Sequence, residues 1–257
     1  MGILNATPDS FYEGSRIHVG KAIDAAAMML QEGAHILDIG GQSTRPGAVT
    51  VSASEEIDRV LPVIDNILQH FPGTTISADT FYASVAKAAV EAGATIVNDI
   101  SAGDDDPEML PFIAKAGVTY IAMHKRGIPL NMQHNPTYND VVKDVIDYFS
   151  NKKILFQNLD INNWILDPGF GFGKTQAHNF QILRELKEFG IFKKPILIGI
   201  SRKSMIWKTL NSSPEEALNG TTALHMAGLI HGADILRVHD VKAAFECLTL
   251  YSSMQNS

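Results

Sequence analysis

The sequence predicts an α/β protein, a (β/α)8 barrel in a single domain, and three observations support this prediction. Eight short apolar segments recur along the 257 residues, amphipathic segments separate them, and polar residues follow each apolar segment. The apolar segments do not alternate with polar residues, which is typical of strands buried on both faces of a parallel sheet. Their spacing of about 30 residues fits one strand and one helix in each repeat.

A repeated motif marks where helices end and strands begin. It consists of a glycine, a small residue and an apolar run, and it stands at 33–38, 93–99, 117–124 and 232–239. Glycine closes a helix because it adopts the left-handed backbone without a clash of a Cβ atom. We therefore expect eight strands, near residues 2–5, 35–39, 75–79, 95–99, 118–123, 163–167, 195–200 and 234–238.

Apolar residues at three-and-four spacing predict a helix between residues 52 and 71. Ser52 and Glu55 form a capping-box pattern at its start, and Pro72-Gly73 ends it. Pro62 lies inside this helix and is expected to kink or split it. Further helices are expected around 22–32, 83–92, 138–157, 176–189, 214–231 and 241–254.

An open doubly wound sheet is the alternative to the barrel. The barrel is favoured because polar motifs follow all eight strands, whereas an open sheet concentrates its site at one switch point. No low-complexity segment or interdomain linker interrupts the sequence, so residues 1–257 are expected to form one barrel. Met1 already belongs to the first strand, and we expect a short upstream segment to be missing.

Composition and charge exclude several classes of function. The formal net charge of −7 argues against nucleic-acid binding, which depends on a basic surface. No apolar run reaches the ~18 residues of a membrane helix, and the N-terminus has no signal-peptide pattern. Cys247 is the only cysteine, which excludes an internal disulfide and fits a reducing cytosol. We therefore expect a cytoplasmic protein that binds small molecules.

Polar side chains at the strand ends predict the site, because the C-terminal ends of barrel strands converge on one face. Asp79, Asn98 and Asp167 suit a flat, amide-rich heterocycle, since carboxylates and amides make orienting hydrogen bonds. Asn5 offers a neutral oxygen to a hard cation such as Mg²⁺. The cations that suit a phosphate or pyrophosphate are Arg45, Arg237 and His239.

Some of these residues also have simpler interpretations. A strand-end aspartate such as Asp38 or Asp79 often caps the following helix, although the presence of Asn98 and Asp167 weakens that interpretation. The glycine-rich run at 169–173 is by itself compatible with a plain turn. We expect His124 to be structural or peripheral rather than catalytic.

Six motifs resemble, in order, the signatures of dihydropteroate synthases. They stand at 1–11, 40–47, 98–101, 167–174, 201–204 and 237–240, and the resemblance extends from residue 1 to about residue 245. Those enzymes join 7,8-dihydropterin-6-ylmethyl diphosphate to 4-aminobenzoate, release pyrophosphate and make 7,8-dihydropteroate, a folate precursor. The resemblance therefore implies a transferase of folate biosynthesis, with Mg²⁺ as its cofactor and a homodimeric assembly.

The resemblance also implies a role for each motif residue. The pterin would be held by Asp79, Asn98, Asp167 and Lys203, with Arg237 stacked on its face. Asn5 would bind Mg²⁺, and the diphosphate would meet Thr44, Arg45, Arg237 and His239. The 4-aminobenzoate would contact Pro46, Phe172, Lys203 and Ser204. The implied catalytic group is Asn5, Arg45, Lys203, Arg237 and His239, and the implied mechanism is dissociative, with pyrophosphate leaving before the arylamine attacks.

Two loops are expected to act as lids. Residues 6–18 and 43–52 follow the first two strands, carry few aliphatic residues and contain Gly14 and Gly47, so we expect them to close over bound pyrophosphate and pterin. Tyr12-Glu13 and Gln42 depart from the usual pattern of the family, in which Glu is frequent at the Gln42 position. These departures bear on the geometry of the loops.

Three other functions remain open. A pterin-dependent methyltransferase domain resembles this family in its barrel and pterin contacts, but it needs no anion site. A non-catalytic pterin-binding barrel is expected to lack Asn5, Arg45 or Lys203, and this sequence has all three. A Schiff-base aldolase that uses Lys203 is a further option, which borohydride trapping with a carbonyl substrate tests.

Overall fold

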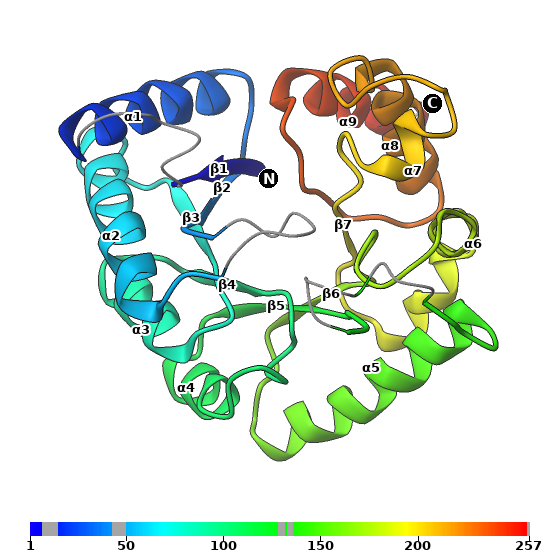
Figure 1. Ribbon diagram of the computed structural model, residues 1–257, viewed down its shortest axis with the longest axis horizontal. Coiled ribbons are helices and arrows are strands. Elements are labelled where there is room, and N and C mark those ends of the chain that lie inside the picture. The colour runs from blue at the N-terminus through cyan, green and yellow to red at the C-terminus, as the bar shows by residue number, and fades with distance from the viewer. Residues whose placement is uncertain (7–14, 43–49, 128–131, 133–135, 256–257) are drawn as a thin grey trace.

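The computed structural model of the protein describes residues 1–6, 15–42, 50–127, 132 and 136–255, with the backbone alone for 15–19. In this part of the chain, parallel strands form an inner wall and helices surround them (Figure 1). The strands are β1 (Gly2–Asn5), β2 (Ile36–Gly40), β3 (Thr75–Asp79), β4 (Ile96–Asp99), β5 (Thr119–Met123), β6 (Trp164–Asp167), β7 (Leu197–Ile198) and β8 (Ile235–Leu236).

Backbone hydrogen bonds close these strands into a barrel. β1 to β6 form one parallel sheet in sequence order, and β7 pairs with β8. A parallel bridge between Leu166 and Ile196 joins β6 to the segment of β7, and another between Gly2 and Val238 joins β8 to β1. Across this second seam, the Ile3 N–H donates to the Val238 carbonyl at 2.9 Å. The predicted (β/α)8 barrel is therefore confirmed.

Helices cover the outside of the barrel (Figure 1). Along the described chain they are α1 (Ser15–Gln31), α2 (Ala53–His70), α3 (Ala83–Glu91), α4 (Met109–Ala116), α5 (Val141–Asn158), α6 (Gln176–Arg184), the 3₁₀ helix η2 (Leu186–Phe192), α7 (Ser204–Trp207), α8 (Leu218–Ile230) and α9 (Val241–Gln255). The main hydrophobic core includes Ile64, Val97 and Phe149, which come from helices and from the sheet. None of the helices in the described ranges is long and apolar enough to cross a membrane.

The helix-ending glycines have the backbone that the repeated motif predicts. Gly33, Gly93, Gly117 and Gly232 have positive φ angles of 97°, 113°, 65° and 98°. A residue with a Cβ atom is strained in this region, so glycine lets each helix turn directly into the following strand.

β7 and β8 are shorter than the predicted strands 195–200 and 234–238. Pro195 has no N–H to donate to a neighbouring strand. The Asp234 carboxylate accepts from the Ile196 N–H at 2.8 Å, so this donor is used by a side chain rather than by the sheet. Local side-chain chemistry therefore shortens the regular ladder at this seam of the barrel.

Several helix predictions also need correction. α2 is continuous through Pro62, so the expected split does not occur. Ser52 accepts from the Glu55 N–H at 3.2 Å, but the Glu55 carboxylate pairs with Arg59 instead of completing the capping box. The helix predicted at 176–189 divides into α6 and η2, and the sequence analysis does not predict α4 or α7.

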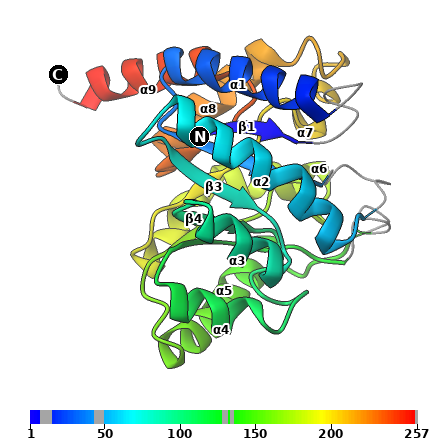
Figure 2. The ribbon, with the colours of Figure 1, turned by 90° about the vertical axis from the view of Figure 1, so that its left-hand side faces the viewer.

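The barrel interior is apolar near the N-terminal ends of the strands and polar near their C-terminal ends. Ile96, Ile121, Ile165 and Leu197 form one cluster, with Met1, Ile36 and Ile235 packed against it. Successive side chains along a strand point to opposite faces, so the residue two positions further points into the same interior. Asp38 follows Ile36, Asn98 follows Ile96, Asp167 follows Ile165 and Arg237 follows Ile235 in this way. β1 and β3 point toward the same end of the barrel (Figure 2), which is where these polar side chains gather.

Candidate active site

Arg237 lies between two carboxylates at the C-terminal end of the barrel. Its Nε donates to Oδ2 of Asp38 and its Nη2 donates to Oδ2 of Asp79, both at 2.6 Å. The amide of Asn98 donates to the same oxygen of Asp38 at 3.1 Å. The barrel therefore brings the predicted residues Asp79, Asn98 and Arg237 into one hydrogen-bonded cluster, although Arg237 lies far along the chain from its partners.

Asp38 is the member of this cluster that has no role among the sequence predictions. It is fully buried, and α2 is capped by Ser52, so the helix-cap interpretation of Asp38 is wrong. Its Oδ1 accepts no hydrogen bond from any residue in the described ranges. The signal that identifies it is its interior position two residues after Ile36, because a buried carboxylate requires a cation or hydrogen-bond donors.

A second cluster surrounds Asp167 at the end of β6. Its Oδ1 accepts from the Gly169 N–H at 2.7 Å. Lys203 donates to the carbonyl of Phe170, and its ammonium lies 4.9 Å from the centre of the Phe172 ring, in a cation–π contact. The predicted residues Asp167, Phe172 and Lys203 are therefore brought together by the loop after β6.

The two clusters meet beside Gly199, which follows β7. A Cβ atom built on Gly199 would lie 3.9 Å from Nζ of Lys203 and 4.0 Å from Cβ and Cδ of Arg237. Because both cationic side chains border the same backbone position, the two clusters form one site rather than two.

The loop after β6 requires its glycines. Gly169, Gly171 and Gly173 have φ angles of 73°, 88° and 68°, in the left-handed region. A Cβ atom on Gly169 would lie 1.9 Å from the carbonyl oxygen of His124, and one on Gly173 would lie 2.1 Å from that of Arg126. The loop therefore packs directly on the backbone that follows β5.

Lys174 ends this loop, and its ammonium is enclosed by acceptors. Its Nζ donates to the carbonyls of Gly169 at 2.8 Å, Phe172 at 3.2 Å and His124 at 3.3 Å. Nδ1 of His124 lies 2.9 Å from the same Nζ, so four neighbouring acceptors share the three N–H groups of the ammonium. Burial lowers the pKa of Lys174 to about 7, although Asp167 acts in the opposite direction. His124 therefore has the structural position expected for it, and Lys174 is a buried cation that the sequence analysis does not single out.

His239 shares the hydroxyl of Ser201. Its backbone N–H donates to Oγ of Ser201 at 3.2 Å, and its Nδ1 lies 3.1 Å from the same oxygen. The neighbouring Arg202 makes two hydrogen bonds to the Asp240 carboxylate, each at 2.8 Å. These contacts tie the loop after β7, which carries Lys203, to the loop after β8, which carries His239.

Burial changes the protonation of several site residues. It lowers the pKa of Lys203 to about 8, with Asp167 opposing, so this side chain is mostly cationic at pH 7. It raises the pKa of Asp79 to about 7, with Arg237 opposing. Burial and the charge of Arg237 lower the pKa of His239, so its imidazole is neutral at pH 7. His239 therefore offers an uncharged hydrogen bond in the free protein.

α2 holds the chain where it leaves β2. The Gln42 amide donates to Oε2 of Glu56 at 2.6 Å, and Arg59 donates to the Gly41 carbonyl at 2.8 Å. Glu56 is fully buried, and this burial raises its pKa. A glutamate at the Gln42 position would bring two carboxylates together, so glutamine provides the donor that Glu56 needs.

The remaining predicted residues lie at the edge of the site or outside the described residues. Asn5 ends β1, is partly exposed and pairs with Gly40 of β2. Ser204 follows Lys203, begins α7 and is exposed. Thr44, Arg45 and Pro46 lie outside the described residues, as does most of the two expected lids at 6–18 and 43–52.

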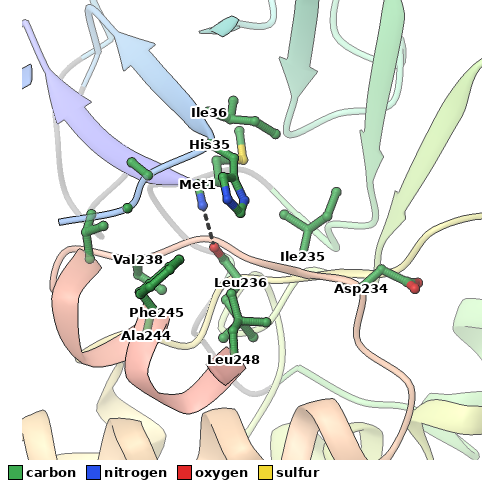
Figure 3. A pocket seen from close by; sticks show the side chains of 13 residues that line it. Met1, His35, Ile36, Asp234, Ile235, Leu236, Val238, Ala244, Phe245 and Leu248 are labelled. Carbon is green, nitrogen blue, oxygen red and sulfur yellow. Dashed lines mark hydrogen bonds between the residues drawn. The ribbon is translucent and has the colours of Figure 1, made fainter. Parts of the chain in front are cut away.

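A pocket of about 90 Å³ lies where β2 and β8 begin, and therefore at the opposite end of the barrel from the site. Figure 3 shows the residues that line it. His35 and Ile36 border it at the start of β2, and Phe245 and Leu248 of α9 close another side. The Met1 ammonium donates to the Leu236 carbonyl at 3.0 Å beside it. Its lining is mostly apolar and contains none of the clustered site residues, so this pocket is separate from the site.

The family of the chain follows from comparison with known proteins. The family model described as pterin binding enzyme matches residues 1–239. The chain is 43% identical over 251 residues to the dihydropteroate synthase of Escherichia coli K12, covering 96% of this chain and 88% of that protein. It is also 43% identical over 259 residues to the dihydropteroate synthase of Bacillus subtilis, covering 100% of this chain and 88% of that protein.

Solved structures of similar proteins share the whole fold. The dihydropteroate synthase of Yersinia pestis, in a sulfonamide drug complex, has a TM-score of 0.94 at 42% identity and covers 100% of this chain and 94% of its own. That of Clostridium difficile, in the presence of pteroic acid, has a TM-score of 0.93 at 37% identity, with coverage of 100% and 96%. That of Xanthomonas albilineans, with 4-aminobenzoic acid, has a TM-score of 0.93 at 38% identity, with coverage of 100% and 93%.

A barrel with carboxylates, an amide and cations at the C-terminal ends of its strands, matched by this family model, defines a pterin-binding enzyme. The chain belongs to that family and, within it, to the dihydropteroate synthases, which are transferases of folate biosynthesis.

Proposed function

We propose that the protein joins 7,8-dihydropterin-6-ylmethyl diphosphate to 4-aminobenzoate and releases pyrophosphate and 7,8-dihydropteroate. The observation that carries this proposal is the convergence of Asp79, Asn98, Asp167, Lys203 and Arg237 at one end of the barrel. The pteroic acid and 4-aminobenzoic acid in the structures of its relatives correspond in chemistry to the product and to one substrate.

The pterin is held by the carboxylates and the amide in this proposal. Asp167 has one oxygen bonded to Gly169, which leaves its other oxygen as an acceptor for the amino group of the pterin. Asn98 and Asp79 supply further polar contacts, and Lys203 donates to the ring carbonyl. Arg237 has its guanidinium plane fixed by Asp38 and Asp79, which suits stacking on the flat ring.

The diphosphate and the arylamine use the cationic side of the site. Arg237 and the neutral imidazole of His239 donate to the diphosphate, together with Thr44 and Arg45 from the segment outside the described residues. The 4-aminobenzoate lies against Phe172, with Lys203, Ser204 and Pro46 as its other contacts. The cation–π contact of Lys203 with Phe172 supports this arrangement, because it gives the carboxylate of the substrate a cation beside an apolar surface.

Mg²⁺ is the proposed cofactor, and Asn5 is its proposed protein ligand. The described residues include no group of three His, Cys, Asp or Glu side chains that could hold a metal ion. The single neutral oxygen of Asn5 fits an ion that obtains its other ligands from diphosphate and water, as Mg²⁺ commonly does. When bound, Mg²⁺ would neutralise part of the diphosphate charge.

The proposed reaction is dissociative. The bond between the pterin methylene carbon and the diphosphate oxygen breaks, and its electron pair leaves with pyrophosphate. The pterin ring stabilises the methylene cation, and the nitrogen lone pair of 4-aminobenzoate forms the new C–N bond. The amine then loses a proton to solvent. Arg237 and His239 contribute by stabilising the charge that develops on the leaving group.

The decisive experiment measures pyrophosphate release from purified protein given the pterin diphosphate, 4-aminobenzoate and Mg²⁺. We expect release that depends on 4-aminobenzoate, that stops when a chelator removes Mg²⁺ and that is accompanied by a product with the mass of dihydropteroate. Absence of release at saturating substrate and Mg²⁺ would contradict the proposed function.

We further propose that the protein is a homodimer of the cytoplasm and binds neither nucleic acid nor membrane. Exposed apolar side chains on α8 and α9, including Ile230, Leu250 and Met254, support an interface between copies. The buried, unpaired thiol of Cys247 is compatible with a reducing compartment. Sedimentation equilibrium tests the dimer, since a monomeric mass across the micromolar range contradicts it.

A further inference from the structure

Lys174 is a buried cation for which the proposed mechanism has no use. It is 2% exposed, yet its ammonium contacts backbone carbonyls and an imidazole nitrogen rather than a paired carboxylate. Burying a charge in this way is unfavourable unless the group is extensively hydrogen-bonded. Its four acceptors come from two places, namely His124 after β5 and the glycine-rich loop after β6.

The contacts of Lys174 lead to residues that the proposed function assigns to both substrates. Its Nζ holds the Gly169 carbonyl, and the Gly169 N–H holds Oδ1 of Asp167 at 2.7 Å. Its Nζ also holds the Phe172 carbonyl at 3.2 Å. The Lys174 ammonium is therefore linked to the Asp167 carboxylate through two hydrogen bonds, by way of Gly169. It is linked to Phe172 directly, through one hydrogen bond.

The loop needs such an anchor because its own backbone does not determine its shape. Three of its residues are glycines with positive φ, and glycine has more accessible backbone conformations than any other residue. Lys203 donates to the Phe170 carbonyl, while Lys174 donates to the carbonyls of Gly169 and Phe172. The two lysines together hold three carbonyls of this loop.

We propose that Lys174 is a positioning residue for the reaction, which holds the loop after β6 so that Asp167 and Phe172 face the pterin and 4-aminobenzoate. It acts through these two residues and does not touch either substrate. The inference rests on the proposed function, because the roles of Asp167 and Phe172 come from it.

The test replaces Lys174 with methionine, which has similar length and no donor. We expect Lys174→Met to raise the KM for 4-aminobenzoate and the Kd for pteroic acid about tenfold each. The change in kcat should be smaller, because displaced contacts weaken the binding of substrates more than they slow the chemical step. Lys174→Gln keeps two donors on a shorter side chain, so it should fall between the wild type and Lys174→Met. It also serves as the test variant if the methionine variant does not fold.

Lys152 provides a matched control. It is 7% exposed and donates to the Ala102 carbonyl at 2.7 Å and to Asp104 at 2.6 Å, in the loop after β4. Lys152→Met therefore removes a buried lysine that also holds a loop carbonyl, but it touches neither Asp167 nor Phe172. We expect it to lower the melting temperature while leaving KM and Kd within twofold of wild type.

Two outcomes overturn the inference. One is wild-type KM and Kd in a folded Lys174 variant. The other is an equal loss of binding in Lys152→Met and Lys174→Met, which would assign the effect to stability in general. Failure of the proposed function is recognised separately, because wild-type protein would then release no pyrophosphate. Calorimetry with pteroic acid still compares the variants in that case, and equal affinities for pteroic acid overturn the positioning role.

Discussion

Asp38 shows how one buried side chain organises several site residues. Its Oδ2 receives hydrogen bonds from both Arg237 and Asn98, and Asp38 is itself fully buried. Arg237 is thus held by Asp38 from inside the barrel and by Asp79 from the rim. This arrangement fixes the guanidinium before any ligand arrives, so the binding free energy is not spent on ordering a long side chain.

Asp38→Asn should weaken pterin binding while the barrel stays folded. The amide has the same shape, but it removes the charge from a charge-assisted hydrogen bond worth roughly 1.5–3 kcal/mol. We therefore expect the Kd for pteroic acid, measured by calorimetry, to rise about tenfold or more. Asp104→Asn, which changes a carboxylate paired with Lys152 away from the site, should leave the Kd unchanged. Equal affinities of wild type and Asp38→Asn would remove Asp38 from the positioning of Arg237.

At the scale of single elements, two glycines of the loop after β6 differ in how well they would tolerate a side chain. Gly169 and Gly171 both have positive φ, but their surroundings differ. A Cβ atom on Gly169 would lie 1.9 Å from a backbone oxygen, whereas one on Gly171 would meet nothing closer than Lys203 Cδ at 3.5 Å. Only the first position combines backbone strain with a steric clash.

Gly169→Ala should therefore destabilise the protein far more than Gly171→Ala. At Gly171 the left-handed backbone alone costs about 1–2 kcal/mol. At Gly169 the loop must move away from His124, which also breaks the Lys174 contacts. Urea unfolding measures both effects, and equal midpoints for the two variants would show that the close packing on His124 does not limit stability.

The elements themselves could be predicted to different extents. Strand positions followed from sequence because a helix-ending glycine and a doubly buried apolar run are local signals, as at Gly33 and Gly93. α4 and α7 have eight and four residues, too short for a clear periodic pattern. The shortening of β7 depends on Asp234, which directly precedes β8 and which no local pattern near β7 reveals.

The residues of the site could be predicted from the sequence, but the contacts between them could not. Asp79, Asn98, Asp167 and Arg237 could be predicted because barrel strands converge at their C-terminal ends. The contact of Arg237 with Asp38 spans 199 positions, and the enclosure of Lys174 depends on His124, 50 positions away. Such contacts depend on tertiary packing, which is why the contacts of Asp38 and Lys174 became evident only from the structure.

At the scale of the whole molecule, pyrophosphate should stabilise the fold through the anion site. A ligand that binds only the folded state stabilises it by RT ln(1 + [L]/Kd), or about 2.7 kcal/mol at one hundred times Kd. We expect pyrophosphate with Mg²⁺ to raise the melting temperature of the wild type and to have little effect on Arg237→Gln. Arg184→Gln, which alters an exposed arginine on α6, is the control and should keep the full shift. Equal shifts in wild type and Arg237→Gln would locate the anion elsewhere.

The global stability should also fall in acid because of His225. This α8 residue is 2% exposed, its Nε2 bonds to no group within the described residues, and burial lowers its pKa to about 4. In the unfolded chain a histidine titrates near 6.5, so the unfolded state takes up the proton first as pH falls. Stability is therefore present above pH 6.5 and is lost progressively down to about pH 4, by about 3 kcal/mol for this residue.

His225→Phe should flatten this part of the stability profile. Urea unfolding at pH 7, 5.5 and 4.5 gives the slope for wild type and variant, and the difference isolates His225 from other buried histidines. His70→Gln changes an exposed histidine and should retain the wild-type slope. A variant slope equal to that of wild type would mean that His225 is not buried in its neutral form.

Closure of the barrel between β8 and β1 has a consequence for folding during synthesis. A ribosome delivers Asp38 and Asp79 long before Arg237, which is their counter-charge. Until that arginine emerges, closing the barrel would bury two carboxylates without a cation, which is strongly unfavourable. We therefore expect the barrel to close only after the last strand has emerged. A prematurely terminated chain that lacks Arg237 is then expected to stay open and to be cleaved by proteases more readily than the full chain.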